Sequence, residues 1–163
     1  MAKVIIVNDN DEIIRYKERA TVEATDIYRV SALWVQDSMG NILLAQRSLK
    51  KKNSPGKWGP AVAGTNEEGE TYESNILKEA EEEIGLKGYA FQKKHKERHL
   101  GDHDYFVQIF FLMIDKNIGE FKVQESEVQQ VKWFTKKGLL EELKQNPDMF
   151  LKSVKDCFDL FNK

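Results

Sequence analysis

The chain of 163 residues contains a single cysteine, Cys157, and only three prolines, and it lacks long apolar runs. One cysteine cannot form an internal disulfide, and it excludes a metal site built from cysteine ligands. No apolar stretch approaches the ~20 residues that a membrane-spanning helix needs, and the apolar run near the first residue is too short for a signal peptide. We therefore expect a cytoplasmic protein that does not bind membranes.

The chain also lacks a dominant charge. Its formal net charge is -2, so there is no overall attraction to nucleic acid, and we expect no nucleic-acid partner. The length suits one domain, residues 1–163, which can bury roughly two thirds of the surface of the unfolded chain without disulfides. No internal repeat or low-complexity linker divides the sequence.

The segment 64–86 is rich in glutamate and contains a single lysine. On a helix, residues three and four apart are neighbours, so Glu79, Glu82 and Glu83 share one face and repel one another. A divalent cation among them would remove that repulsion. Mg²⁺ prefers carboxylate oxygens together with substrate phosphates, so this cluster predicts a metal site that handles phosphate.

The same segment carries start and stop signals for a helix. Thr71 or a close neighbour can cap its beginning, and Gly85 follows the position where the last turn should end. The face that we expect to point inward consists of apolar residues: Ile76, Leu77, Ala80 and Ile84.

The rest of the sequence predicts strands before and after this helix. Apolar and β-branched runs bounded by turn residues indicate strands, and two amphipathic runs near the end indicate helices. The pattern predicts a mixed sheet between helical layers, an α+β class. The expected strands are 4–7, 12–16, 30–36, 42–47, 105–114 and 128–135, and the expected helices after the glutamate segment are 137–145 and 150–161, with 30–36 and 42–47 as an antiparallel pair.

At the glutamate segment the sequence resembles the Nudix box. That pattern reads Gly, five residues, Glu, seven residues, then Arg-Glu-aliphatic-any-Glu-Glu-any-Gly-aliphatic, and the chain matches it at Gly64, Glu70, Glu79, Glu82, Glu83, Gly85 and Leu86. Lys78 replaces the usual arginine, and Ala80 replaces a larger aliphatic residue. Lysine keeps the charge but loses the planar fork of arginine, so we expect Glu70 to be held more loosely.

The resemblance implies the Nudix fold, an α/β/α sandwich, and hydrolysis of a nucleoside diphosphate linked to another moiety, or of a similar organic diphosphate, by water attack on phosphorus. It implies that Mg²⁺ or Mn²⁺ is held by the carboxylates of the box with the Gly64 carbonyl, and that a carboxylate of the cluster acts as general base. It also implies that Glu70 orients the helix through Lys78. Members of the family often form homodimers. The implied ligands and catalytic residues are Glu79, Glu82 and Glu83.

Many Nudix proteins place a further acid on a loop after the box. Glu127 is our first choice for this catalytic carboxylate, and Asp102 with Asp104 is the second, at a position similar to paired acids of isopentenyl-diphosphate isomerases. Each could equally be a solvated loop charge. Arg47, at the end of an expected strand, is the basic residue that we expect to contact substrate phosphate.

Two alternatives to a hydrolase remain. The flanking sequence resembles the isomerase subgroup, but that isomerase needs a cysteine before the box glycine and a histidine after it, where this chain has Ala63 and Thr65. The other alternative is a catalytically silent Nudix domain that only binds a nucleotide or a partner. The intact set of box glutamates disfavours it.

Overall fold

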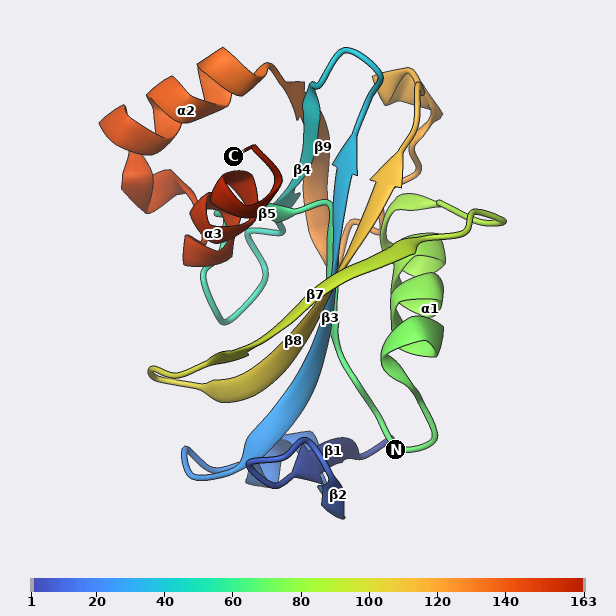
Figure 1. Ribbon diagram of the computed structural model, residues 1–163, viewed down its shortest axis with the longest axis vertical. Coiled ribbons are helices and arrows are strands. Elements are labelled where there is room, and N and C mark those ends of the chain that lie inside the picture. The colour runs from blue at the N-terminus through green and yellow to red at the C-terminus, as the bar shows by residue number, and fades with distance from the viewer. Residues whose placement is uncertain (1, 163) are drawn as a thin grey trace.

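One mixed sheet organises the molecule. The computed structural model describes residues 2–162, and in them nine strands join into a single sheet. Helix α1 (Tyr72–Ile84) lies on one side of this sheet, while α2 (Lys136–Gln145) and α3 (Lys152–Phe161) lie on the other, as Figure 1 shows. The expected α/β/α sandwich is therefore confirmed.

The elements follow the sequence pattern closely. The first hairpin, the glutamate helix and both late helices occur where they were expected, with ends shifted by up to two residues. Within residues 2–162, no helix is long and apolar enough to span a membrane. The strands are β1 (Val4–Val7), β2 (Ile13–Lys17), β3 (Ile27–Gln36), β4 (Ile42–Arg47), β5 (Trp58–Pro60), β6 (Val62–Thr65), β7 (Gln92–His99), β8 (Asp104–Met113) and β9 (Val128–Phe134), and short 3₁₀ turns lie at Arg19–Thr21, Ile118–Glu120 and Pro147–Met149.

Strand β3 is the centre of the sheet. The parallel strand β8 pairs with it along its whole length, from Ile27 opposite Asp104 to Gln36 opposite Met113. The other edge of β3 is shared in turn by β1, β6 and β4. The expected pairing of β3 with β4 is therefore short, because β6 occupies the next positions on that edge. Strand β4 instead pairs with β5 and β9.

Helix α1 covers one face of the sheet through a narrow apolar stripe. Ile76, Ala80 and Ile84 are at most 1% exposed and join the core formed with β3, β4 and β8. Leu77 is 47% exposed, so its expected place in that stripe is wrong. It follows Ile76 by one residue, which turns its side chain by about 100° around the helix and away from the sheet.

The opposite face of the sheet packs against α2 and α3. Trp34 and Trp58 lie in this second core. Cys157 on α3 is 3% exposed in the same cluster, so it is separated from α1 by the sheet. Burial raises the pKa of its thiol to about 12, which makes it an inert core residue.

The stripe on α1 makes a prediction about stability. Ile76→Ala should lower the free energy of unfolding by about 2–5 kcal/mol, because it leaves a cavity in the core. Leu77→Ala should cost less than about 1 kcal/mol, because that side chain is half exposed. Urea denaturation of the two variants measures both values, and equal losses would show that the orientation of α1 described here is wrong.

Candidate active site

Helix α1 is fixed at both ends by local interactions. The Thr71 hydroxyl accepts a hydrogen bond from the Ser74 amide at 3.1 Å, and the Ser74 hydroxyl accepts one from the Thr71 amide at 2.8 Å. This capping box satisfies amides that the first turn leaves unpaired. Gly85 ends the helix with a φ of 72°, a conformation that glycine adopts without strain. The predicted helix ends are confirmed.

Strand β6 passes close to the glutamate face of α1. A Cβ atom placed on Gly64 would lie 2.5 Å from Cγ of Glu79, and 3.2 Å from Oδ1 of Asn75. Such distances are shorter than van der Waals contact, so only glycine permits this approach. The first glycine of the box therefore lets the strand backbone lie directly against the acidic side chains.

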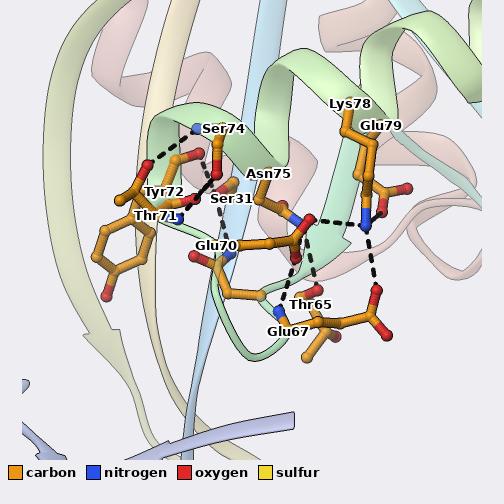
Figure 2. A network of polar contacts seen from close by, with 11 residues as sticks. Ser31, Thr65, Glu67, Glu70, Thr71, Tyr72, Ser74, Asn75, Lys78 and Glu79 are labelled. Carbon is orange, nitrogen blue, oxygen red and sulfur yellow. Dashed lines mark hydrogen bonds and ion pairs between the residues drawn. The ribbon is translucent and has the colours of Figure 1, made fainter. Parts of the chain in front are cut away.

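Glu70 links the loop after β6 to the helix, as Figure 2 shows. Its Oε2 lies 2.7 Å from Nζ of Lys78, and its Oε1 accepts hydrogen bonds from the Glu67 amide at 2.7 Å and from Nδ2 of Asn75 at 3.1 Å. Burial opposes ionisation of Glu70, but these donors together hold its pKa below the ordinary value. The looser hold expected from Lys78 is not what the structure shows, because two further donors complete the shell.

The carboxyls of Glu79 and Glu83 meet beside β6. Burial raises the pKa of Glu83 to about 8, and the charges of Glu79 and Glu127 add to the effect, while the Ala63 amide opposes it. Burial also raises the pKa of Glu79, and the charge of Lys78 opposes this effect. Two acidic groups held together in a poorly hydrated place resist ionisation unless a cation joins them.

Glu82 takes a different position from its two neighbours. Its side chain is exposed on the solvent side of the helix, although its negative charge contributes to the raised pKa of Glu79. In residues 2–162, no three or more histidine, cysteine, aspartate or glutamate side chains are arranged as a ready metal cage. The structure thus brings two of the three expected ligands together, and a full set would require Glu82 to turn toward them.

Glu83 lines a cavity of about 90 Å³. Glu127, the loop acid expected to complete the site, lines the same cavity. Arg47 and Lys51 line the same cavity, and Lys51 forms an ion pair with Glu127. Antiparallel pairing explains this meeting, because Arg47 at the end of β4 lies opposite Val128 at the start of β9. Two carboxylates and two basic side chains from distant segments therefore surround one space.

Asp102 and Asp104 are not in this cavity. Asp104 receives two hydrogen bonds from the guanidinium of Arg98, at 2.9 and 2.8 Å, and lies opposite Ile27 at the beginning of β3. Ala63, which lines the cavity, lies opposite Ala32, five residues further along that strand. Asp102 is exposed in the turn before β8. The structure thus does not bring these aspartates to Glu83.

The sequence reasoning did not single out two residues of this region. Lys51 belongs to a run of lysines in a loop, and nothing in the run distinguishes the one that meets Glu127. Asn75 is completely buried on α1. A polar residue on the buried face of a predicted helix was the signal that could have singled it out.

The donor set fits a divalent cation of the Mg²⁺ type. The oxygens of Glu79 and Glu83 are hard donors, both carboxyls have raised pKa values, and Glu83 forms no ion pair within residues 2–162. A cation would supply the missing positive charge and return both groups to the ionised state.

The raised pKa of Glu83 predicts how stability depends on pH in chelator-treated protein. Its pKa rises from 4.5 to about 8 on folding, so the native state holds this proton more tightly, and that contribution to stability is lost as the pH rises through 8. Glu83→Gln removes the titration. The variant should therefore match the wild type near pH 4.5 and exceed its Tm at pH 9 by about 2–4 °C or more. Thermal unfolding across this range measures the difference, and parallel profiles for both proteins would contradict it.

Comparison with known proteins agrees with this geometry. A sequence model described as the NUDIX domain matches residues 27–154. An uncharacterised Nudix hydrolase of Escherichia coli, YfcD, is 31% identical over 134 residues, which cover 81% of this chain and 73% of YfcD. An isopentenyl-diphosphate Delta-isomerase of Enterobacter is 32% identical over 85 residues, 51% of this chain and 46% of that protein.

The fold is shared with solved structures. The crystal structure of DR0079 from Deinococcus radiodurans superposes with a TM-score of 0.82 at 20% identity, covering 99% of both chains. The fold thus agrees along nearly the whole chain, and the family match includes the glutamate helix and the cavity residues. The chain belongs to the Nudix family, and the expected class of enzyme, a Nudix-type pyrophosphohydrolase, is confirmed.

Proposed function

We propose that the protein is a metal-dependent hydrolase that cleaves the diphosphate linkage of a nucleoside diphosphate bound to another moiety, or of a similar organic diphosphate. The observation that carries this proposal is the cavity in which Glu83 and Glu127 face Arg47 and Lys51. Acidic groups suited to a cation and basic groups suited to phosphate oxygens lie within one small space. A diphosphate needs both.

The box carboxylates would hold the cation. Glu79 and Glu83 are in place beside β6, and the exposed Glu82 would turn toward them when the cation binds. The carbonyl of Gly64 is the backbone ligand that the family pattern suggests. The cation, Mg²⁺ or Mn²⁺, would neutralise phosphate charge and make a bound water more acidic. Glu70 with Lys78 would keep the helix oriented toward the strand.

The remaining cavity residues would serve the substrate and the proton. Arg47 and Lys51 can donate to phosphate oxygens. Lys51 is paired with Glu127 in the free protein, so a bound diphosphate would compete for it and leave the Glu127 carboxylate free to accept a proton from water. Glu127 is therefore our choice for the general base, and Glu83 is the second.

This chain lacks the cysteine and the histidine that the isomerase reaction needs. Ala63 and Thr65 lie on β6 at the places where the isomerase needs its cysteine and histidine. Cys157 cannot substitute, because it is buried on the other face of the sheet. The partial similarity to an isopentenyl-diphosphate isomerase therefore supports a shared scaffold, and the two replaced residues favour hydrolysis.

The metal site predicts the effect of one conservative substitution. Glu83→Gln should lower turnover by about 10²-fold or more, because a ligand charge and a candidate base are lost together. Glu81→Gln is the matched control, since Glu81 lies on the same helix but is exposed and paired with Lys87. Steady-state rates with Mg²⁺ compare the two variants. Near-normal turnover of the Glu83 variant would overturn the site.

The metal requirement has its own test. Excess chelator should abolish hydrolysis, and added Mg²⁺ or Mn²⁺ should restore it, because Glu83 forms no ion pair within residues 2–162 and the Lys78 ammonium, 3.6 Å from Glu79, is shared with two other glutamates. The substrates to screen are nucleoside diphosphate derivatives, dinucleotides and prenyl diphosphates, with released monophosphate as the signal. Activity in excess chelator would exclude the proposed mechanism. Conversion of a prenyl diphosphate without phosphate release would indicate the isomerase, and binding without turnover would indicate a silent domain.

Three further expectations remain predictions. They are a single domain over residues 1–163, a cytoplasmic location, and a small-molecule substrate without a nucleic-acid partner. We also expect a homodimer, which is common among family members.

A further inference from the structure

Asn75 is an unusual residue for its position. It is completely buried on α1, yet its amide serves two separate segments. Its Nδ2 donates to the carbonyl of Thr65 at the end of β6, at 3.2 Å, and to Oε1 of Glu70, at 3.1 Å (Figure 2). The side chain thus ties the strand, the following loop and the helix together at one point.

The orientation of this amide is determined by its neighbours. Nδ2 faces two acceptors, so the reversed amide would place an oxygen against two oxygens. The actual Oδ1 atom is buried and has no hydrogen-bond partner within residues 2–162. Burying an acceptor without a partner is unfavourable, and an alanine here would avoid that cost. The asparagine therefore needs a reason beyond packing.

The reason lies in the lysine one helical turn further on. Of the two Glu70 oxygens, Lys78 pairs with Oε2, and its ammonium is also shared with Glu67 at 3.1 Å and Glu79 at 3.6 Å. Asn75 supplies the side-chain donor for Oε1 of Glu70. An arginine at position 78 could bind both oxygens with the two arms of its planar group. Lysine is a point charge and cannot do so. Asn75 and Lys78 together present the two donors that one guanidinium would present.

We propose that Asn75 is a positioning residue that replaces the second arm of the missing arginine and thereby holds Glu70 and β6 in register with the acidic face of α1. Through Thr65 it also fixes the strand beside Gly64, where the backbone touches Glu79. The part of this inference that concerns metal binding rests on the proposed function. The part that concerns Glu70 does not.

The first test uses metal-free protein and a cycle of four variants: wild type, Asn75→Ala, Lys78→Arg and the double variant. The reporter is hydrogen exchange of the Glu67 amide, which donates to the same Glu70 oxygen as Asn75. In the lysine background Asn75→Ala should speed this exchange by at least about threefold, because Glu70 loses a donor. In the arginine background it should have little effect. Equal acceleration in both backgrounds would overturn the proposal.

The second test measures Mn²⁺ binding by the same four proteins, with free Mn²⁺ followed by electron paramagnetic resonance. Residues that support metal ligands typically change affinity by about 10–100-fold when removed. Asn75→Ala should thus weaken Mn²⁺ binding by about tenfold with Lys78, and by less than about threefold with arginine. Additive losses would contradict the proposal. If the wild type binds no Mn²⁺, the proposed function fails, and the exchange cycle still decides the role of Asn75.

Ser74→Ala is the matched control for both tests. Ser74 belongs to the same turn of α1, and its hydroxyl caps Thr71, but it has no contact with Glu70 among its hydrogen bonds. The control should lower Tm while leaving Mn²⁺ affinity unchanged. If Ser74→Ala weakens Mn²⁺ binding as much as Asn75→Ala does, the effect is general destabilisation of the helix, and the proposal is wrong.

Discussion

The arrangement of the glutamate helix depends on the hydrogen bonds and the ion pair that the Glu70 carboxylate forms. Its two oxygens are shared among a backbone amide of the loop, an amide side chain of α1 and the ammonium of Lys78. Because these donors belong to different segments, the loop cannot move away from the helix without losing charged hydrogen bonds. Asn75 also donates to the Thr65 carbonyl of β6, and this hydrogen bond connects the Glu70 cluster to the strand in which Gly64 lies against Glu79.

The distribution of counter-charges separates structural acids from candidate functional ones. Glu70 is matched by Lys78, and Glu127 is matched by Lys51. Glu83 is largely buried and forms no ion pair within residues 2–162, so its pKa rises to about 8. A carboxyl kept in this state is unfavourable for the empty protein. The charge is left for a ligand to compensate, which is the common physical reason that perturbed acids gather at functional sites.

The sheet supplies the other half of the cavity. Strand β4 pairs with β9, and the amide of Ser48 donates to the carbonyl of Glu127 at 3.0 Å, so the loop acid is placed by backbone hydrogen bonds next to the end of β4. Strand β6 reaches the same place through its pairing with β3. Paired strands thus hold the segments that carry the cavity residues. A rigid support of this kind favours precise geometry at a site.

The sequence alone determined the class of fold, the ends of the glutamate helix, its acidic face and the family, because these depend on local periodicity and on fixed spacing within one segment. It also pointed to Arg47 and ranked Glu127 above Asp102 and Asp104, but no local pattern could establish which of these acids reaches the glutamate helix. Only the tertiary structure decided which charges meet, since Glu127 and Lys51 are brought together by strand pairing over 76 residues. The same holds for Asn75, whose partners are chosen by packing between strand and helix, and no local pattern encodes that contact.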